Sequence, residues 1–302
     1  MQNTRLNLID LDQDAEGYRK FLSCWVSRSD NVTFIVDPGP VSSVDYLIGE
    51  LRSFGIDKLD FVLLTHIHLD HGGGVAKVLN AFPDARIYCH KSGVKHIVNP
   101  ARLWEGSKKV LKEVADMYGE PSPVSPDKMI AEEDLAAAGI EVIHTPGHAV
   151  HHDAFLHDGT LFIGEAFGTH VELPSGRLYL RPATPPRFFL QQALDSLDRI
   201  LELPDEPLRT AFAHWGMRDG AFLYARAVKK QLILWTDSIS ELVKQSTDNL
   251  EQRLFDRLMK IDPLYGQGLF DELDDDLKVR ERHFLGNTLE GMLGFIESFE
   301  AK

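Results

Sequence analysis

Residues 65–74 read Thr-His-Ile-His-Leu-Asp-His-Gly-Gly-Gly. This histidine-rich motif follows residues 59–64, a short apolar run that is typical of a strand covered on both faces. A helical pattern starts at Val75, so we expect the motif to lie in a loop at the carboxyl end of a strand, where α/β proteins place their sites. Three imidazoles and a carboxylate are costly to desolvate without a partner, but they are natural ligands of a divalent cation. The motif therefore predicts a metal site.

Three later apolar runs end in the same way, with a ligand-type side chain placed after the run and beside glycine or proline. These side chains are His148, Glu165 and His214, which follow the predicted strands 140–144, 161–164 and 210–213. A single ligand-type side chain after one apolar run would not indicate a site. Its repetition at four strand ends indicates that the four segments converge on one site.

The overall composition narrows the class of partner. The chain has 302 residues, about twice the usual domain length, and a formal net charge of −14 from 32 Lys and Arg against 46 Asp and Glu. A surface this acidic repels phosphate backbones and anionic lipids, so we expect a small-molecule substrate and neither nucleic acid nor membrane. Cys24 and Cys89 lie in apolar runs, which predicts buried, reduced thiols. With no secretion signal and no apolar stretch of about 18 residues, we predict a cytoplasmic protein.

The motifs, taken together, resemble those of the metallo-β-lactamase superfamily. His-Ile-His-Leu-Asp-His at 66–71, His-Thr-Pro-Gly-His at 144–148, Phe-Ile-Gly-Glu at 162–165 and His214 occur in the order of that family. The resemblance implies a four-layer αββα sandwich for residues 1–216. Residues 217–302 have helical periodicity, which predicts a helical C-terminal extension packed on the sandwich.

The resemblance also implies two metal ions, each held by three motif side chains. The implied ligands are His66, His68 and His148 for the first ion and Asp70, His71 and His214 for the second. Glu165 takes the bridging position, where the family usually has aspartate. The extra methylene group can change the separation of the ions, make the bridge asymmetric or favour one ion over two. Zinc is the expected metal, and iron and manganese are also compatible with a ligand set that contains no cysteine.

The implied activity is hydrolysis of an acyl bond, in an ester, lactone or thioester, by a metal-bound hydroxide. Asp70 is the candidate catalytic residue, because it can orient the hydroxide or pass a proton to the leaving group. One alternative is an iron-dependent oxidoreductase on the same fold, similar to the sulfur dioxygenases. Another is a binding module without catalysis. Gly168 stands where acyl-homoserine-lactone lactonases have tyrosine, which weakens the assignment as a lactonase.

Four residues are candidates for contact with substrate: His170, Tyr179, Arg181 and Arg187. The two arginines can bind a substrate carboxylate, but salt bridges to the acidic body compete with that interpretation.

Other histidines outside the motifs receive a different interpretation. His151 and His152 are interpreted either as hydrogen-bond partners of the ligands or as polar loop residues, and His144 as structural. The remaining histidines are predicted not to be ligands: His90, His96, His157 and His283. The helical pattern around 94–134 and the C-terminal helices are expected either to wall the mouth of the site or to form a homodimer surface.

Overall fold

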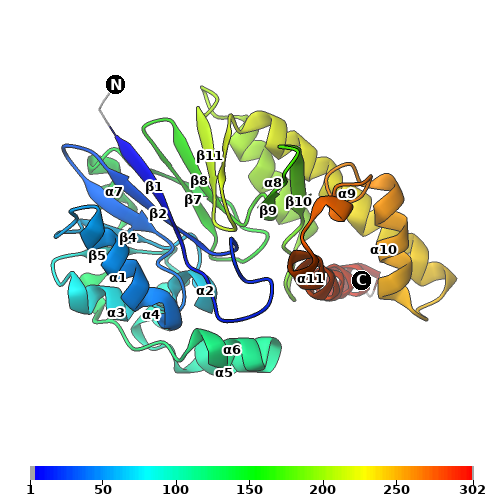
Figure 1. Ribbon diagram of the computed structural model, residues 1–302, viewed down its shortest axis with the longest axis horizontal. Coiled ribbons are helices and arrows are strands. Elements are labelled where there is room, and N and C mark those ends of the chain that lie inside the picture. The colour runs from blue at the N-terminus through cyan, green and yellow to red at the C-terminus, as the bar shows by residue number, and fades with distance from the viewer. Residues whose placement is uncertain (1–3, 301–302) are drawn as a thin grey trace.

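The structure is a computed structural model that describes residues 4–300. Two β-sheets face each other, and helices cover the outer face of each (Figure 1). This is the αββα sandwich that the motifs predicted. The first three residues of the predicted segment 1–216 and the last two of 217–302 lie outside the described residues.

The first sheet has five strands in sequential order, and helices cross over between its parallel strands. Its strands are β1 (Arg5–Asp10), β2 (Ser23–Arg28), β3 (Thr33–Val36), β4 (Phe61–Leu63) and β5 (Arg86–Tyr88). The first three pair antiparallel, and β4 and β5 continue in parallel with β3. The parallel pairs place the carboxyl ends of β3, β4 and β5 at one edge, where the histidine-rich motif follows β4.

The second sheet has the strand order β12-β11-β8-β7-β6, with β8 and β11 parallel and the other pairs antiparallel. Its strands are β6 (Glu141–His144), β7 (Asp153–His157), β8 (Thr160–Gly164), β11 (Arg209–Phe212) and β12 (Met217–Asp219). A separate antiparallel hairpin is formed by β9 (Thr169–Glu172) and β10 (Leu178–Arg181). β12 lies just past Gly216, so the sheet continues for three residues beyond the predicted end of the sandwich.

Helices cover the outer face of the first sheet. Val44, Leu47 and Leu51 form the buried stripe of α1 and join the core beneath the sheet, as helical spacing requires. The helical elements on this side of the molecule are η1 (Val41–Ser43), α1 (Val44–Ser53), α2 (Leu69–Gly72), α3 (Val75–Ala81), α4 (Val94–Val98), α5 (Ala101–Leu111), α6 (Glu113–Tyr118), η2 (Pro126–Lys128) and α7 (Glu132–Ala137).

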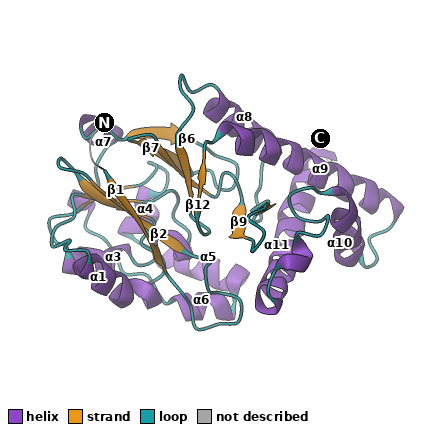
Figure 2. Ribbon diagram, turned by 45° about the horizontal axis from the view of Figure 1, so that its top comes forward, coloured by secondary structure: helices purple, strands orange, loops and turns teal. Residues whose placement is uncertain are grey.

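The second sheet is covered by helices that follow residue 189, which Figure 2 shows grouped on one side of the strands. These elements are α8 (Leu190–Leu201), α9 (Phe222–Gln245), α10 (Leu250–Ile261), η3 (Phe270–Glu272) and α11 (Asp275–Glu300). Trp235 of α9, Leu254 of α10 and Met292 of α11 are fully buried in one core with Ile163 of the second sheet. The C-terminal helices therefore pack on the sandwich and share its core.

A third apolar cluster fills the space between the two sheets. Phe34 of the first sheet meets Phe162 of the second edge to face, with ring centroids 5.8 Å apart. Cys24 and Cys89 are buried and are not disulfide-bonded. Within residues 4–300, no helix combines the length and the apolarity that crossing a membrane requires.

Candidate metal centre

The histidine-rich motif leaves β4 and turns sharply into the short helix α2. His68 precedes the helix in extended conformation, and the backbone N–H of His71 donates to the carbonyl of His68 at 3.1 Å. Gly74 then passes so close to the turn at Gly39 that a β-carbon on it would overlap the side chain of Val44. Its N–H donates to the Gly39 carbonyl at 2.8 Å. Glycine is needed here because the backbone packs directly against a neighbouring turn.

All seven predicted ligands converge, and they do so in two adjacent groups. Within each group the ligand atoms lie within 4.8 Å of one another. The groups are His66, His68, His148 and Glu165, and Asp70, His71 and His214. Apart from His68 and Asp70, which are partly buried, these residues are buried, so protein atoms surround most of the cluster.

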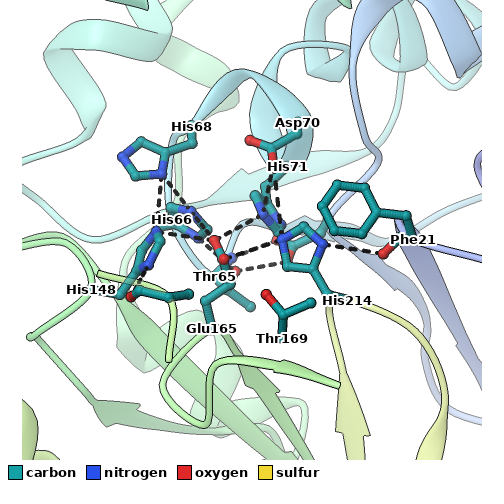
Figure 3. A network of polar contacts seen from close by, with 12 residues as sticks. Phe21, Thr65, His66, His68, Asp70, His71, His148, Glu165, Thr169 and His214 are labelled. Carbon is teal, nitrogen blue, oxygen red and sulfur yellow. Dashed lines mark hydrogen bonds and ion pairs between the residues drawn. The ribbon is translucent and has the colours of Figure 1, made fainter. Parts of the chain in front are cut away.

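The Glu165 carboxylate lies at the centre of the cluster, as Figure 3 shows. Its Oε2 atom is 3.3 Å from Nε2 of both His66 and His71 and 3.0 Å from Nε2 of His148. Its Oε1 atom is 3.2 Å from Nε2 of His214. One carboxylate therefore contacts both groups, which is the arrangement that a bridging ligand requires.

Four of the five imidazoles are held by a hydrogen bond at Nδ1, so that Nε2 points into the centre. His148 contacts the carbonyl of Ala183 at 2.9 Å, and His214 contacts the carbonyl of Phe21 at 3.2 Å. A carbonyl only accepts, so both Nδ1 atoms carry the proton and both Nε2 atoms keep a lone pair. Metal-binding histidines in proteins are oriented in this way.

Asp37 orients the other two of these rings. Its Oδ2 atom lies 3.0 Å from His71 Nδ1 and accepts from the Thr65 hydroxyl at 2.7 Å, while its Oδ1 accepts from the Thr65 N–H. The Thr65 hydroxyl, having donated to Asp37, can accept from His66 Nδ1 at 3.1 Å. No role for Asp37 followed from the sequence alone. The feature of the sequence that could have indicated a role is that Asp37 opens the turn Asp-Pro-Gly directly after β3.

His152 supports Glu165 from behind. Its Nδ1 lies 2.8 Å from the Thr145 hydroxyl, and its Nε2 accepts the backbone N–H of Glu165 at 3.0 Å. Of the two interpretations offered for His151 and His152, His152 is thus a hydrogen-bond partner of a candidate ligand. His151 faces the cavity described below and its buried Nδ1 has no hydrogen-bond partner in the described residues.

The electrostatics keep most of these groups in the forms that bind cations. Burial, reinforced by His148, lowers the pKa of His68 to about 3, and burial lowers the pKa of His66 well below its usual value. Burial opposes ionisation of Asp70, but the nearby His71 outweighs it and lowers the pKa of Asp70 to about 2. Burial likewise opposes ionisation of Glu165, but His148 and His214 hold its pKa well below the usual range. Neutral imidazoles beside ionised carboxylates are the protonation states that metal ligands need.

His71 is the exception, because two carboxylates flank it. Burial lowers its pKa, but Asp70 and Asp37 outweigh burial and hold the pKa well above the usual value. Its Nε2 atom is nevertheless buried without a hydrogen-bond partner in the described residues. A buried ring nitrogen that lies 3.3 Å from Glu165 Oε2 and 3.5 Å from Asp70 Oδ2 without a hydrogen bond to either fits a cation placed between them.

A sequence profile of the metallo-beta-lactamase superfamily matches residues 18–210, which is more than half of the chain. The chain belongs to the metallo-beta-lactamase superfamily. The matched region contains every candidate ligand except His214, which lies four residues beyond its end.

Known proteins similar to this superfamily member include the metallo-beta-lactamase fold-containing protein ST1585 of Sulfurisphaera tokodaii. Identity to it is 32% over 211 residues, which cover 66% of this chain and 75% of that protein. The hydroxyacylglutathione hydrolase of Aeromonas salmonicida is 30% identical over 240 residues, which cover 77% of each chain. The crystal structure of ST1585 matches with a TM-score of 0.65 at 23% identity and covers 97% of this chain and 98% of that one, so the fold is shared over nearly the whole chain.

In this superfamily member, the candidate centre lies at the base of a cavity of about 390 Å³. One wall comes from the helical insert, with Leu103, Val110 and Leu111 of α5, and another from α11, with Phe284 and Thr288. Both helical regions thus wall the mouth of the site, which was one of the two roles expected for them. The other role, a homodimer surface, stays a prediction.

The four predicted substrate contacts do not share one location. Arg181 lines the cavity, but it is buried and its Nε donates to Glu281 at 2.8 Å, as the competing salt-bridge interpretation held. Tyr179 and His170 are buried outside the cavity lining, where Tyr179 donates to Glu281 and His170 Nδ1 donates to the Trp215 carbonyl at 2.6 Å. Arg187 is exposed and also lies outside the lining. Only their position near the motifs had suggested these roles.

Two of the histidines predicted not to be ligands lie in the cavity lining or in a further group of ligand-type side chains. His96 lines the cavity. His90 lies beside His144 and Asp153, in a third group whose ligand-type atoms are within 4.8 Å of one another. The sequence around His90 and His96 predicted neither arrangement, because both arrangements depend on contacts between distant segments.

Proposed function

We propose that this chain is a metal-dependent hydrolase that cleaves an acyl bond of a small substrate. The supporting observation is that a single carboxylate, Glu165, lies within 3.3 Å of four oriented imidazoles at the base of a cavity. In this proposal His66, His68 and His148 would hold one divalent ion, Asp70, His71 and His214 would hold a second, and Glu165 would contribute its carboxylate to both groups. Zinc is the proposed metal. When bound, two divalent ions lower the pKa of a water molecule toward neutrality and polarise an acyl carbonyl.

Asp70 is the proposed proton-handling residue. Its side chain is 18% exposed whereas those of Glu165 and His71 are 8% and 2% exposed, and it lines the cavity. It is ionised at neutral pH, because its pKa lies at about 2. A carboxylate that reaches the cavity and is also tied to His71 can orient the attacking water and deliver its proton to the leaving group.

A thioester is the first substrate class to test, with simple esters next. The Aeromonas salmonicida relative is named a hydroxyacylglutathione hydrolase, and its similarity covers most of both chains. Gly168 has a φ of +78°, and a β-carbon there would overlap the Arg181 carbonyl, so a tyrosine cannot be accommodated at this position without a backbone shift. A lactonase that depends on tyrosine at 168 is therefore disfavoured.

The test begins with metal quantification on protein purified without added metal, followed by thioester, ester and lactone assays. His68→Ala and Asp70→Ala are expected to abolish turnover, by at least about a thousandfold, with the fold retained as judged by circular dichroism. His283→Ala and Asp237→Ala, on exposed faces of α11 and α9, are the matched controls and should retain full turnover. Retained turnover in both site variants contradicts the proposal. Iron content together with oxidation of a sulfur substrate and no hydrolysis would favour the oxidoreductase alternative.

A further inference from the structure

A cluster of ligand-type side chains lies outside the proposed metal centre and shares no residue with it. His90 follows β5 of the first sheet, while His144 ends β6 and Asp153 begins β7 of the second. One ring nitrogen from each histidine and one Asp153 oxygen lie within 4.8 Å of one another. Because β5 and β6 belong to different sheets, this cluster joins two layers of the sandwich at one edge.

The chemistry of the cluster suits a cation. The side chain of Asp153 is 0% exposed. Its hydrogen-bond partners among residues 4–300 are His144, at 2.7 Å from Oδ1, and the Tyr88 hydroxyl, which donates to Oδ2 at 3.0 Å. His90 Nδ1 accepts the Ser92 backbone N–H at 3.3 Å and lies 2.8 Å from the Ser92 hydroxyl, so Nε2 is the ring nitrogen left to face an ion. Binding there requires Nε2 to lose its proton, as every imidazole ligand must. The His90 and His144 rings meet edge to face at 89°, with centroids 5.5 Å apart.

We propose that His90, His144 and Asp153 form a separate binding site for one first-row transition-metal ion, for which Zn²⁺ is the probe. Two imidazole nitrogens and one carboxylate oxygen are ligands that zinc, cobalt and nickel accept, whereas Mg²⁺ and Ca²⁺ prefer oxygen ligands alone. Glu132, whose carboxylate lies 3.4 Å from His144 Nε2, is positioned beside the site as a second acidic group and a fourth ligand-type residue. This site does not depend on the proposed hydrolase activity.

Binding here would clamp the loop that supplies the metal centre. His144 and Asp153 are direct partners in the antiparallel pairing of β6 and β7, so they close the base of loop 145–152. That loop contains His148, a candidate ligand, and His152, which holds the Glu165 backbone. An ion that links its base to His90 would fix the loop to the first sheet. Excess Zn²⁺ should therefore raise the melting temperature of the protein.

Zinc stoichiometry tests the site directly. The full-length protein and three variants, His90→Ala, His144→Ala and the exposed control His283→Ala, are dialysed against buffered micromolar Zn²⁺, and protein-bound zinc is measured by mass spectrometry. We expect His90→Ala and His144→Ala each to bind one zinc equivalent fewer than wild type and than His283→Ala. Their melting temperatures should also no longer rise with the last equivalent of zinc.

The outcomes separate this site from the proposed function. A loss of one equivalent in both variants supports the site, whether the wild type binds three ions or only one. Equal zinc content in all four proteins overturns the proposal and leaves His144 and Asp153 as a simple hydrogen-bonded pair. A loss in His144→Ala but not in His90→Ala also overturns it, because His90 would then not be a ligand. His90 is on the surface edge, so its removal keeps the test valid if His144→Ala does not fold.

Discussion

At the scale of single residues, the candidate centre depends on side chains that orient the ligands as much as on the ligands. Seven ligand-type residues were predictable, because each follows an apolar strand and stands in a recognisable local motif. Asp37 was not, since it contacts His71 34 positions away and no local pattern records that contact. The same holds for the bond between His152 and the Glu165 backbone. Orientation of this kind appears only when the strands are brought together.

Asp37 provides the sharpest test of this orientation. Asp37→Asn keeps the shape of the side chain but turns one acceptor into a donor, which must then face the Thr65 N–H or His71 Nδ1. We expect zinc affinity to fall by about 10- to 100-fold, measured by competition with a chelator. Asp60→Asn is the control, because Asp60 accepts the Thr33 N–H in the same sheet and lies outside the centre. Equal affinity of Asp37→Asn and wild type would show that Asp37 does not orient His71.

Because His170 is buried, we expect the free energy of unfolding to depend on pH. Burial lowers its pKa from 6.5 to about 4, and the bond from Arg218 to its Nε2 holds it neutral. The unfolded state therefore binds more protons between these values, so the stabilisation is complete above pH 6.5 and is lost as pH falls toward 4. The loss attributable to this residue is about 3 kcal/mol. Denaturant unfolding of His170→Gln should show a shallower acid loss than wild type, while exposed His283→Gln should follow wild type. Parallel curves for all three would be inconsistent with a buried neutral His170.

At the scale of elements, the sequence predicted the long periodic segments well and the short irregular ones poorly. The helix expected from Val75 is α3 at Val75–Ala81, and the run 59–64 contains β4. β9, β10 and β12 were missed, because each has only three or four residues and gains its strand geometry from its partner. β9 and β10 pair only with each other, and β12 pairs with the neighbouring β11 at the edge of the second sheet.

Helix α11 shows how an element outside the sandwich supports the centre. Arg280 donates to the Gly17 carbonyl at 2.8 Å and lies 4.5 Å from the Phe21 ring, and the Phe21 carbonyl accepts from His214. Glu281 neutralises this buried arginine at 3.1 Å and Arg181 at 2.8 Å. The helix therefore connects the N-terminal loop, the hairpin and one candidate ligand.

Removing the charge of Glu281 should disrupt this connection. Glu281→Gln leaves two buried arginines without a full counter-charge, so we expect a loss of about 3–5 kcal/mol in the free energy of unfolding. Glu297→Gln, exposed on the same helix, should change stability by less than about 0.5 kcal/mol. Both are measured by denaturant unfolding. A small effect at Glu281 would mean that water or a rearranged side chain replaces the lost charge.

At the scale of the whole molecule, the two sheets meet so that the carboxyl end of β4 faces the ends of β8 and β11. This juxtaposition explains how residues 66 to 214 contribute to a single cluster (Figure 1). The αββα order was predictable from the motifs, and the C-terminal helices from their periodicity. Packing on the sandwich and a wall of the site were both among the expected roles of these helices. Which of their side chains enter the core of the second sheet and line the cavity was not predictable, because both depend on the final packing.

The central claim is that the folded chain holds metal ions between His66, Asp70, His148, Glu165 and His214. A crystal structure of the protein as purified, with anomalous diffraction recorded on both sides of the zinc absorption edge, tests it most directly. The account predicts strong zinc peaks within bonding distance of these side chains, at about 2.0–2.3 Å. The absence of any anomalous peak in this cluster after soaking with zinc, iron and manganese in turn would contradict it.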